Sequence, residues 1–200
     1  MIPLSRETEE RLRAYHSLLL KWQGTINLVS PSTAAQAWDR HFVDSLQLLP
    51  HIPHAAATLY DLGSGGGFPG LVLAIARPDM VVTLVESDAK KCAFLAAVSR
   101  ETGVPVRIET TRIEEAAARL PPPDLVTARA LKPLPILFAM IEPWAVLKPD
   151  LVAVFPKGAT SKAEIEEAKK AGFLFHMEQA VSETDPEARI LTVKNLCRLR

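Results

Sequence analysis

Apolar residues near the start of the chain recur at helical intervals. They do so twice, first as Leu12, Tyr15, Leu19 and Trp22, then as Trp38, Phe42, Leu46 and Leu49. Spacings of three and four residues place each set on one face of a helix. Ser5 can cap the first helix, while the second is expected to begin at Pro31 and to close at Pro50 and Pro53. We expect residues 1–55 to form a helical extension.

From residue 57 onward, short β-rich runs alternate with helical patterns. The expected strands are residues 57–63, 81–86, 104–109, 124–130 and 151–158. The expected helices are 71–77, 89–101, 112–120, 134–147 and 161–172. Such alternation predicts an α/β fold with a parallel sheet covered by helices on both faces.

The end of the chain departs from this alternation. Residues 173–181 and 188–195 both have a strand pattern, and only the polar stretch SETDPE lies between them. Without a helix between them, the two strands should pair as an antiparallel hairpin. The sequence therefore predicts a Rossmann-like sheet of seven strands within residues 56–200, as one structural unit.

Charge and composition narrow the class of protein. Lys and Arg together number 23, as do Asp and Glu, so the formal net charge is zero. This balance argues against a protein that binds polyanions through its overall charge, although a local basic patch remains compatible with it. The two cysteines have neither metal-binding nor C-x-x-C spacing, and the charged N-terminal stretch does not resemble a signal peptide. We expect a cytoplasmic protein, without membrane contact and monomeric.

One short stretch, YDLGSGGGFPG at residues 60–70, contains five of the nine glycines. It follows the first expected strand, so it lies at the carboxyl edge of the sheet, where doubly wound folds bind their ligands. Glycines there let the backbone and the next helix N-terminus approach a ligand. A dinucleotide site would need G-x-G-x-x-G, but the third position holds Phe68, and the G-K-[ST] of a P-loop is missing.

The pattern D-x-G-x-G-x-G fits the same stretch better. Asp61, Gly63, Gly65 and Gly67 match it, and it resembles the first motif of S-adenosylmethionine-dependent methyltransferases. Glu86, which ends the second expected strand, can accept hydrogen bonds from both hydroxyls of a ribose. Because a dinucleotide and S-adenosylmethionine both carry a ribose, Glu86 does not separate them. The terminal hairpin does, because it resembles the addition that distinguishes this methyltransferase sheet from a dinucleotide-binding one.

Several further stretches carry a more specific resemblance. They are KWQGTINLVS, RHFVDSL, DLGSGGGFPGLVLAIARPD, LVESDAKKCAFL, TRIEE, TARA and FPKG, in this order between about Leu18 and Gly158. Together they are similar to the RsmG family, also called glucose-inhibited division protein B. The resemblance implies a class I methyltransferase that uses S-adenosylmethionine to methylate N7 of one guanine in 16S ribosomal RNA. The implied partner is that RNA or the small ribosomal subunit.

The resemblance also implies roles for single residues. Around the cofactor it places Gly63, Gly65, Phe68, Glu86, Ile113, Glu114 and Arg129. Glu86 would hold the ribose, Ile113 and Glu114 would flank the adenine, and Arg129 would lie near the methionine end. Glu86 stands where an aspartate is commoner in the family, which keeps the carboxylate and lengthens its reach.

Four residues are candidates for contact with RNA: Arg40, His41, Asp44 and Lys157. His41 and Asp44 are three positions apart in RHFVDSL, so on a helix they should be close enough to pair. Lys157 ends the fifth expected strand, where it could meet a phosphate. No catalytic base is assigned, because guanine N7 already offers a lone pair and the methyl transfer needs alignment above all.

Three alternatives remain open from the sequence. The chain could be a methyltransferase of the same fold that acts on a small molecule or a protein. It could be a nicotinamide-dependent oxidoreductase. It could also be a non-catalytic, ribosome-associated module that keeps the cofactor fold.

Overall fold

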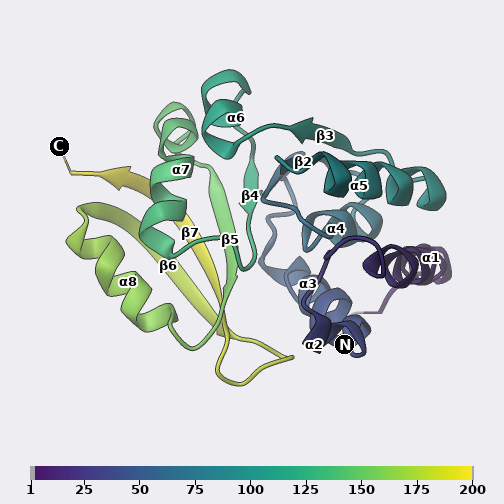
Figure 1. The fold of residues 1–200 in the computed structure, drawn as a ribbon. Coiled ribbons are helices and arrows are strands. Elements are labelled where there is room, and N and C mark those ends of the chain that lie inside the picture. The colour runs from purple at the N-terminus through teal and green to yellow at the C-terminus, as the bar shows by residue number, and fades with distance from the viewer. Residues whose placement is uncertain (1–2, 200) are drawn as a thin grey trace.

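In the computed structural model, which describes residues 3–199, a seven-stranded sheet runs through the molecule with helices on both faces (Figure 1). The strands are β1 (Thr58–Leu62), β2 (Val81–Glu86), β3 (Arg107–Thr110), β4 (Leu125–Thr127), β5 (Val152–Lys157), β6 (Phe173–Val181) and β7 (Arg189–Arg198). Their order is β3-β2-β1-β4-β5-β7-β6. The first five are parallel, and β7 is antiparallel to both β5 and β6. The predicted fold class is confirmed, terminal hairpin included.

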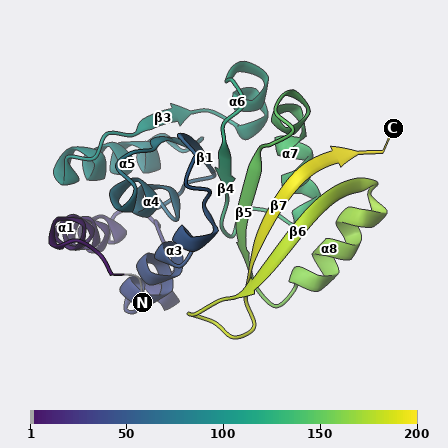
Figure 2. The ribbon, with the colours of Figure 1, turned by 180° about the vertical axis from the view of Figure 1, so that it is seen from behind.

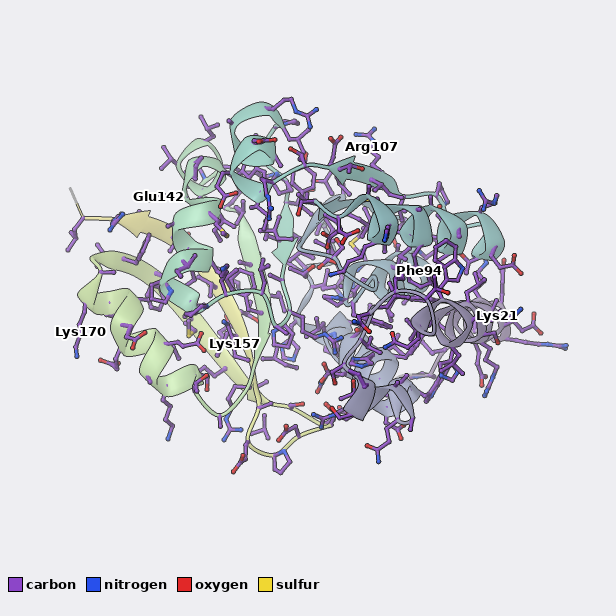
Figure 3. The ribbon with its side chains drawn as sticks, viewed as in Figure 1. Lys21, Phe94, Arg107, Glu142, Lys157 and Lys170 are labelled. Atoms are coloured by element: carbon purple, nitrogen blue, oxygen red, sulfur yellow. The ribbon has the colours of Figure 1, made fainter. Side chains whose placement is uncertain are left out.

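Two apolar cores lie on opposite faces of this sheet, because successive strand residues point to opposite sides. The principal helices are α1 (Arg6–Gln23), α4 (Gly70–Ala76), α5 (Ala89–Thr102), α6 (Ile113–Arg119), α7 (Leu134–Leu147) and α8 (Ser161–Lys170). Leu59 packs with α1, α4 and α5 in one core, whereas Tyr60 packs with α6, α7 and α8 in the other. Phe94 of α5 is buried against Tyr15 and Trp22 of α1 (Figure 3). The expected helix from Ser5 is therefore confirmed, and its apolar stripe covers α4 and α5.

The expected second helix is not continuous. It divides into α2 (Pro31–Ala34), a π-helical segment (Trp38–Val43), α3 (Asp44–Leu46) and a 3-10 turn (Leu49–His51). A π turn holds more residues than an α turn, so it shifts the side chains that follow it around the helix axis. Phe42 stays in the core, while His41 and Asp44 both reach Arg129 at the end of β4.

β3 and β4 each fall three residues short of the expected range at one end. β3 begins at Arg107 instead of residue 104, and β4 ends at Thr127 instead of residue 130. The chain leaves the sheet after Thr127, and three residues later Ala130 adopts a left-handed backbone with φ of 50°. This early exit turns the segment after β4 across the carboxyl edge of the sheet. Among the helices of residues 3–199, none combines the length and the apolar character needed to cross a membrane.

Candidate functional site

The glycine loop lies between β1 and α4, at the carboxyl edge where the strand order reverses between β1 and β4. Gly63, Gly65 and Gly67 have φ values of 64°, 55° and 90°, which side-chain-bearing residues rarely adopt. The amide of Gly65 donates to Glu86 Oε2 at 2.9 Å, which ties the loop to the end of β2. The loop thus needs glycine for its backbone path, as the sequence predicted.

Helix α1 also holds this loop. The Tyr15 hydroxyl donates to the carbonyl oxygen of Gly66, and the Tyr15 ring stacks on Phe68 with 5.3 Å between centroids. A Cβ atom on Gly67 would lie 2.5 Å from the Tyr15 oxygen. The helical extension therefore packs directly on the glycine loop, a contact that the sequence pattern did not indicate.

Two cavities open beside the loop, of about 720 and 620 Å³. Their shared wall is formed by Gly63, Gly65, Arg129, Ala130, Leu131 and Lys132. The smaller cavity contains six of the seven predicted cofactor residues, with Glu86, Ile113 and Glu114 on its far side. The larger contains Phe68 and all four predicted RNA residues. The structure thus brings the two predicted sets to adjacent spaces, and their ligands remain a prediction.

Glu86 is fixed in place by the backbone on both sides. It is buried, its Oε1 accepts from the amide of Asp88 at 2.8 Å, and its Oε2 accepts from that of Gly65. A carboxylate oxygen has more than one lone pair, so each can accept another hydrogen bond. The carboxylate can therefore receive a pair of hydroxyls in the smaller cavity without leaving the loop.

Asp61 is fully buried below the glycine loop. Its Oδ1 accepts from the Thr127 hydroxyl at 2.9 Å, while its Oδ2 has no partner among the described residues. Burial raises the pKa of the Asp61 carboxyl to about 6 from its ordinary 3.8, against the opposing effect of the Thr127 hydrogen bond. The acid form of this residue is accordingly the stable one in the fold at mildly acidic pH.

Asp61→Asn should change how stability depends on pH. Between about pH 4 and pH 6 the folded wild type binds a proton at Asp61 that the unfolded chain has lost, so its unfolding free energy falls as pH rises. The shift corresponds to roughly 3 kcal/mol. Asparagine does not titrate, so the variant should gain about that much relative to the wild type between about pH 4 and pH 7. Urea unfolding at several pH values measures this, and parallel curves for the two proteins would contradict it.

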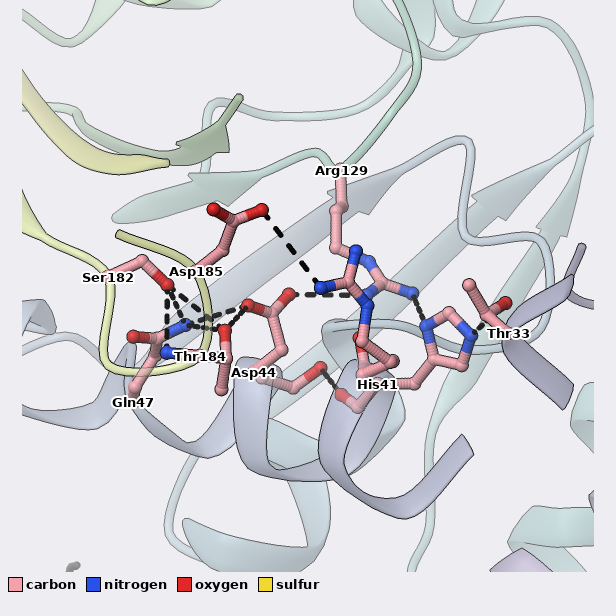
Figure 4. Close-up of polar contacts among 10 residues, drawn as sticks. Thr33, His41, Asp44, Gln47, Arg129, Ser182, Thr184 and Asp185 are labelled. Atoms are coloured by element: carbon pink, nitrogen blue, oxygen red, sulfur yellow. Dashed lines mark hydrogen bonds and ion pairs between the residues drawn. The ribbon is translucent and has the colours of Figure 1, made fainter. Parts of the chain in front are cut away.

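Arg129 follows β4 and is held by three acceptors (Figure 4). Its Nη1 donates to Asp44 Oδ2 at 3.2 Å and to the carbonyl oxygen of Arg40 at 3.0 Å, and its Nη2 donates to His41 Nδ1 at 2.7 Å. The guanidinium lies over the Phe68 ring, 5.2 Å from its centroid. The expected direct pair of His41 with Asp44 is wrong, because Arg129 stands between them.

His41 is an uncharged hydrogen-bonding residue in this site. Burial above all, together with the nearby cations Arg129 and Arg40, lowers its pKa to about 4. Because Nδ1 accepts from Arg129, the proton sits on Nε2, which donates to Thr33 Oγ1 at 2.9 Å. At neutral pH His41 therefore orients Arg129 and offers no positive charge to a phosphate.

Lys157 is also occupied inside the protein. Its Nζ lies 2.8 Å from a Glu164 carboxylate oxygen and donates to the carbonyl oxygen of Lys132 at 2.6 Å. Only 11% of its side chain is exposed. A phosphate contact would require this pair to open, so the geometry assigns Lys157 to holding the segment after β4. The contact of Lys157 with RNA stays a prediction.

Three polar residues of the site escaped the sequence analysis: Gln47, Ser182 and Thr184. Gln47 is buried, and its Nε2 donates to Asp44 Oδ1 at 2.7 Å and to Ser182 Oγ at 3.0 Å. The Thr184 hydroxyl donates to the same Asp44 oxygen at 2.6 Å. These contacts fasten the loop between β6 and β7 to α3 (Figures 1 and 2). The signal in the sequence was one glutamine within the apolar run SLQLL.

Comparison with known sequences decides the family. The family model of GidB, described as rRNA small subunit methyltransferase G, matches residues 8–190. The chain belongs to the GidB family. A GidB relative from Gluconobacter oxydans, named ribosomal RNA small subunit methyltransferase G, is 46% identical over the whole of both chains. One of the same name from Acidiphilium cryptum is 48% identical over 98% of this chain and 94% of its own. The resemblance to RsmG is confirmed.

Solved structures place this GidB member in a wider fold group. An O-methyltransferase from Bacillus cereus, in complex with SAH, shares 15% identity and a TM-score of 0.59, and the match covers 97% of this chain and 93% of the other. A fibrillarin/Nop5p complex contains a chain with the same identity and TM-score over 78% and 82%. At this identity the likeness concerns the fold, which is that of methyltransferases.

Proposed function

We propose that the protein transfers the methyl group of S-adenosylmethionine to N7 of one guanine in 16S ribosomal RNA. The observation that carries this proposal is the pair of cavities that meet at the Gly63–Gly65 loop and the 129–132 segment, in a chain of the GidB family. The smaller cavity takes the cofactor and the larger takes the base. Residues 1–55 serve as an extension that builds part of the larger cavity, beside the cofactor domain of residues 56–200.

The smaller cavity suits the cofactor chemically. Glu86 accepts from the two ribose hydroxyls, and Ile113 and Glu114 flank the adenine at the start of α6. The backbone of Gly63 and Gly65 faces the methionine part, where Arg129 supplies positive charge. When bound, S-adenosylmethionine supplies a methyl group that its sulfonium already activates.

The reaction asks the protein for alignment more than for proton transfer. Guanine N7 presents an acceptor lone pair in its neutral form, so no base has to remove a proton before attack. Holding two reactants in line accounts for roughly 7–11 kcal/mol of barrier in favourable cases. His41 is uncharged and engaged with Arg129, which fits a positioning role. Arg40, whose side chain is 45% exposed at the rim and whose Nη1 lies 4.0 Å from Asp185 Oδ2, has a more exposed side chain than Asp44 or Lys157.

Methyl transfer from labelled S-adenosylmethionine to 16S ribosomal RNA tests the proposal directly. Naked RNA and isolated small subunits should be assayed side by side, and the labelled base identified by the strand cleavage that N7-methylguanine permits. We expect label in a single guanine. Label in protein or small molecules alone would overturn the proposal, and tighter binding of NAD than of S-adenosylhomocysteine would favour an oxidoreductase.

A further inference from the structure

We infer that Asp44 is a positioning residue for Arg129, and that the β6–β7 loop is the structure that holds Asp44 in place. This inference rests on the proposed function of the site. It adds a part of the chain far from the glycine loop to the machinery of methyl transfer. It also replaces the earlier expectation that Asp44 contacts RNA.

Three acceptors hold one end of the Arg129 guanidinium. Asp44, the Arg40 carbonyl and His41 take up Nη1 and one hydrogen of Nη2. Nε–H and the other Nη2 hydrogen have no acceptor among the described residues, and these two form a fork suited to a pair of acceptor atoms. Arg129 lines both cavities, which the proposed function assigns to the cofactor and the base. The direction of the fork depends on the contacts that grip the other end of the guanidinium.

Two neighbouring side chains hold the Asp44 carboxylate. Its Oδ1 accepts from the Thr184 hydroxyl at 2.6 Å and from Gln47 at 2.7 Å, which leaves Oδ2 for Arg129. The Asp44 and Arg129 side chains are 17% and 18% exposed, so the ion pair is mostly shielded from water. Shielded, charge-assisted hydrogen bonds are stronger and more directional than exposed ones. Asp44 is therefore the one charged anchor of Arg129 among the described residues.

Gln47 and Thr184 connect the β6–β7 loop to Asp44. The Gln47 amide binds three points of the loop: Ser182 Oγ and Thr184 Oγ1 accept from its Nε2, and the Glu183 amide donates to its Oε1. Thr184 then reaches Asp44, and Asp44 reaches Arg129 (Figure 4). Polar contacts thus connect Thr184, Asp44 and Arg129 without a break, although the three residues are far apart in the sequence. The loop borders the larger cavity as well, through Thr184 and Asp185.

The test compares Asp44→Asn with Asp39→Asn. Asp39 lies in the neighbouring turn, is exposed and makes no side-chain hydrogen bond with a described residue, so its variant controls for the chemical change. Asparagine at 44 keeps the shape and loses the charge. We expect kcat for RNA methylation to fall roughly 10- to 100-fold with KM for RNA nearly unchanged, because misalignment acts on the chemical step. Asp39→Asn should keep the wild-type kcat.

A second pair of variants addresses the loop. Thr184→Val removes the hydroxyl that donates to the Asp44 carboxylate. We expect kcat to fall roughly 10-fold, because a hydrogen bond to a charged acceptor is lost. Thr184→Ser keeps the hydroxyl and should restore kcat. A role confined to folding would lower the unfolding midpoint of both variants alike and would leave kcat of the folded fraction unchanged, which would overturn the inference.

A spectroscopic readout makes the inference independent of the reaction. In the wild type the Arg129 guanidinium protons should exchange slowly with water and give resolved NMR signals, because Asp44 and His41 hold them. Asp44→Asn should broaden these signals, while Asp39→Asn should not. If wild-type protein methylates no RNA, the proposed function fails and the NMR comparison alone decides. Unchanged Arg129 signals in Asp44→Asn would overturn the inference in either case.

Discussion

Glu86→Gln is expected to weaken the binding of S-adenosylhomocysteine by roughly 100-fold, because two charge-assisted hydrogen bonds of about 1.5–3 kcal/mol each lose their charged acceptor. The loss of affinity should exceed the contribution of these two hydrogen bonds alone. One amide oxygen cannot serve both the Gly65 and Asp88 amides, which the two carboxylate oxygens now bind at 2.9 and 2.8 Å. The NH₂ group would face one of these donors and push the glycine loop away. Isothermal titration with S-adenosylhomocysteine measures the change.

Two variants frame this result. Glu101→Gln makes the same substitution on an exposed residue of α5 and should leave the affinity unchanged. Glu86→Asp keeps the charge with a shorter reach and should fall between the wild type and Glu86→Gln. Equal affinities for Glu86→Gln and Glu101→Gln would mean that the ribose does not bind at the end of β2.

Gly67→Ala is expected to lower the free energy of unfolding by about 3 kcal/mol. Its φ of 90° costs an alanine about 1 kcal/mol or more, and the new methyl group would meet the Tyr15 oxygen at 2.5 Å and Leu71 Cδ1 at 2.7 Å. Overpacking of this kind costs roughly 1–3 kcal/mol, because the surrounding core cannot yield. Urea unfolding of the purified variant measures the sum.

Three further variants separate the two contributions. Gly103→Ala, at a φ of 66° with no atom within 4 Å, should show the backbone cost alone, about 1 kcal/mol. Gly158→Ala has open space and no left-handed backbone, so it should be near neutral. Tyr15→Phe should cost less in the Gly67→Ala background than in the wild type, because it removes the nearest clashing atom. Equal losses for Gly67→Ala and Gly103→Ala would mean that α1 does not press on the loop.

The fold could be predicted from the sequence because each strand and helix carries its own signal. The β-branched run of β2 and the capped pattern of α5 are local, and the hairpin follows from the missing helix before β7. The broken helix after Pro31 could not be predicted this way. Trp38 and Phe42 keep their helical spacing in the sequence, but a π turn forms there, and its His41 contacts Arg129, which lies far away along the chain.

The sequence predicted those site residues that lie at the carboxyl edge of the sheet. Gly63, Glu86 and Ile113 lie at or just after the ends of three strands, and parallel strands bring their ends together, so the proximity of these residues follows from topology. The partners of Asp44 could not be found in this way. Gln47 and Thr184 are ordinary polar residues whose importance comes from a loop that returns from the end of the chain. Similarly, only the fold shows that Glu164 forms an ion pair with Lys157.

The position of β7 inside the sheet has a consequence for vectorial synthesis. β6 precedes β7 along the chain, yet in the finished sheet β7 separates it from β5. While the ribosome is still making Arg189–Arg198, the growing chain holds two strands with open edges that must not pair with each other. Residues 158–172, which include α8, form a crossover long enough to join neighbouring parallel strands, so correct pairing waits for the final strand. A pause in translation before this strand would thus lengthen the interval in which the nascent protein is prone to aggregate.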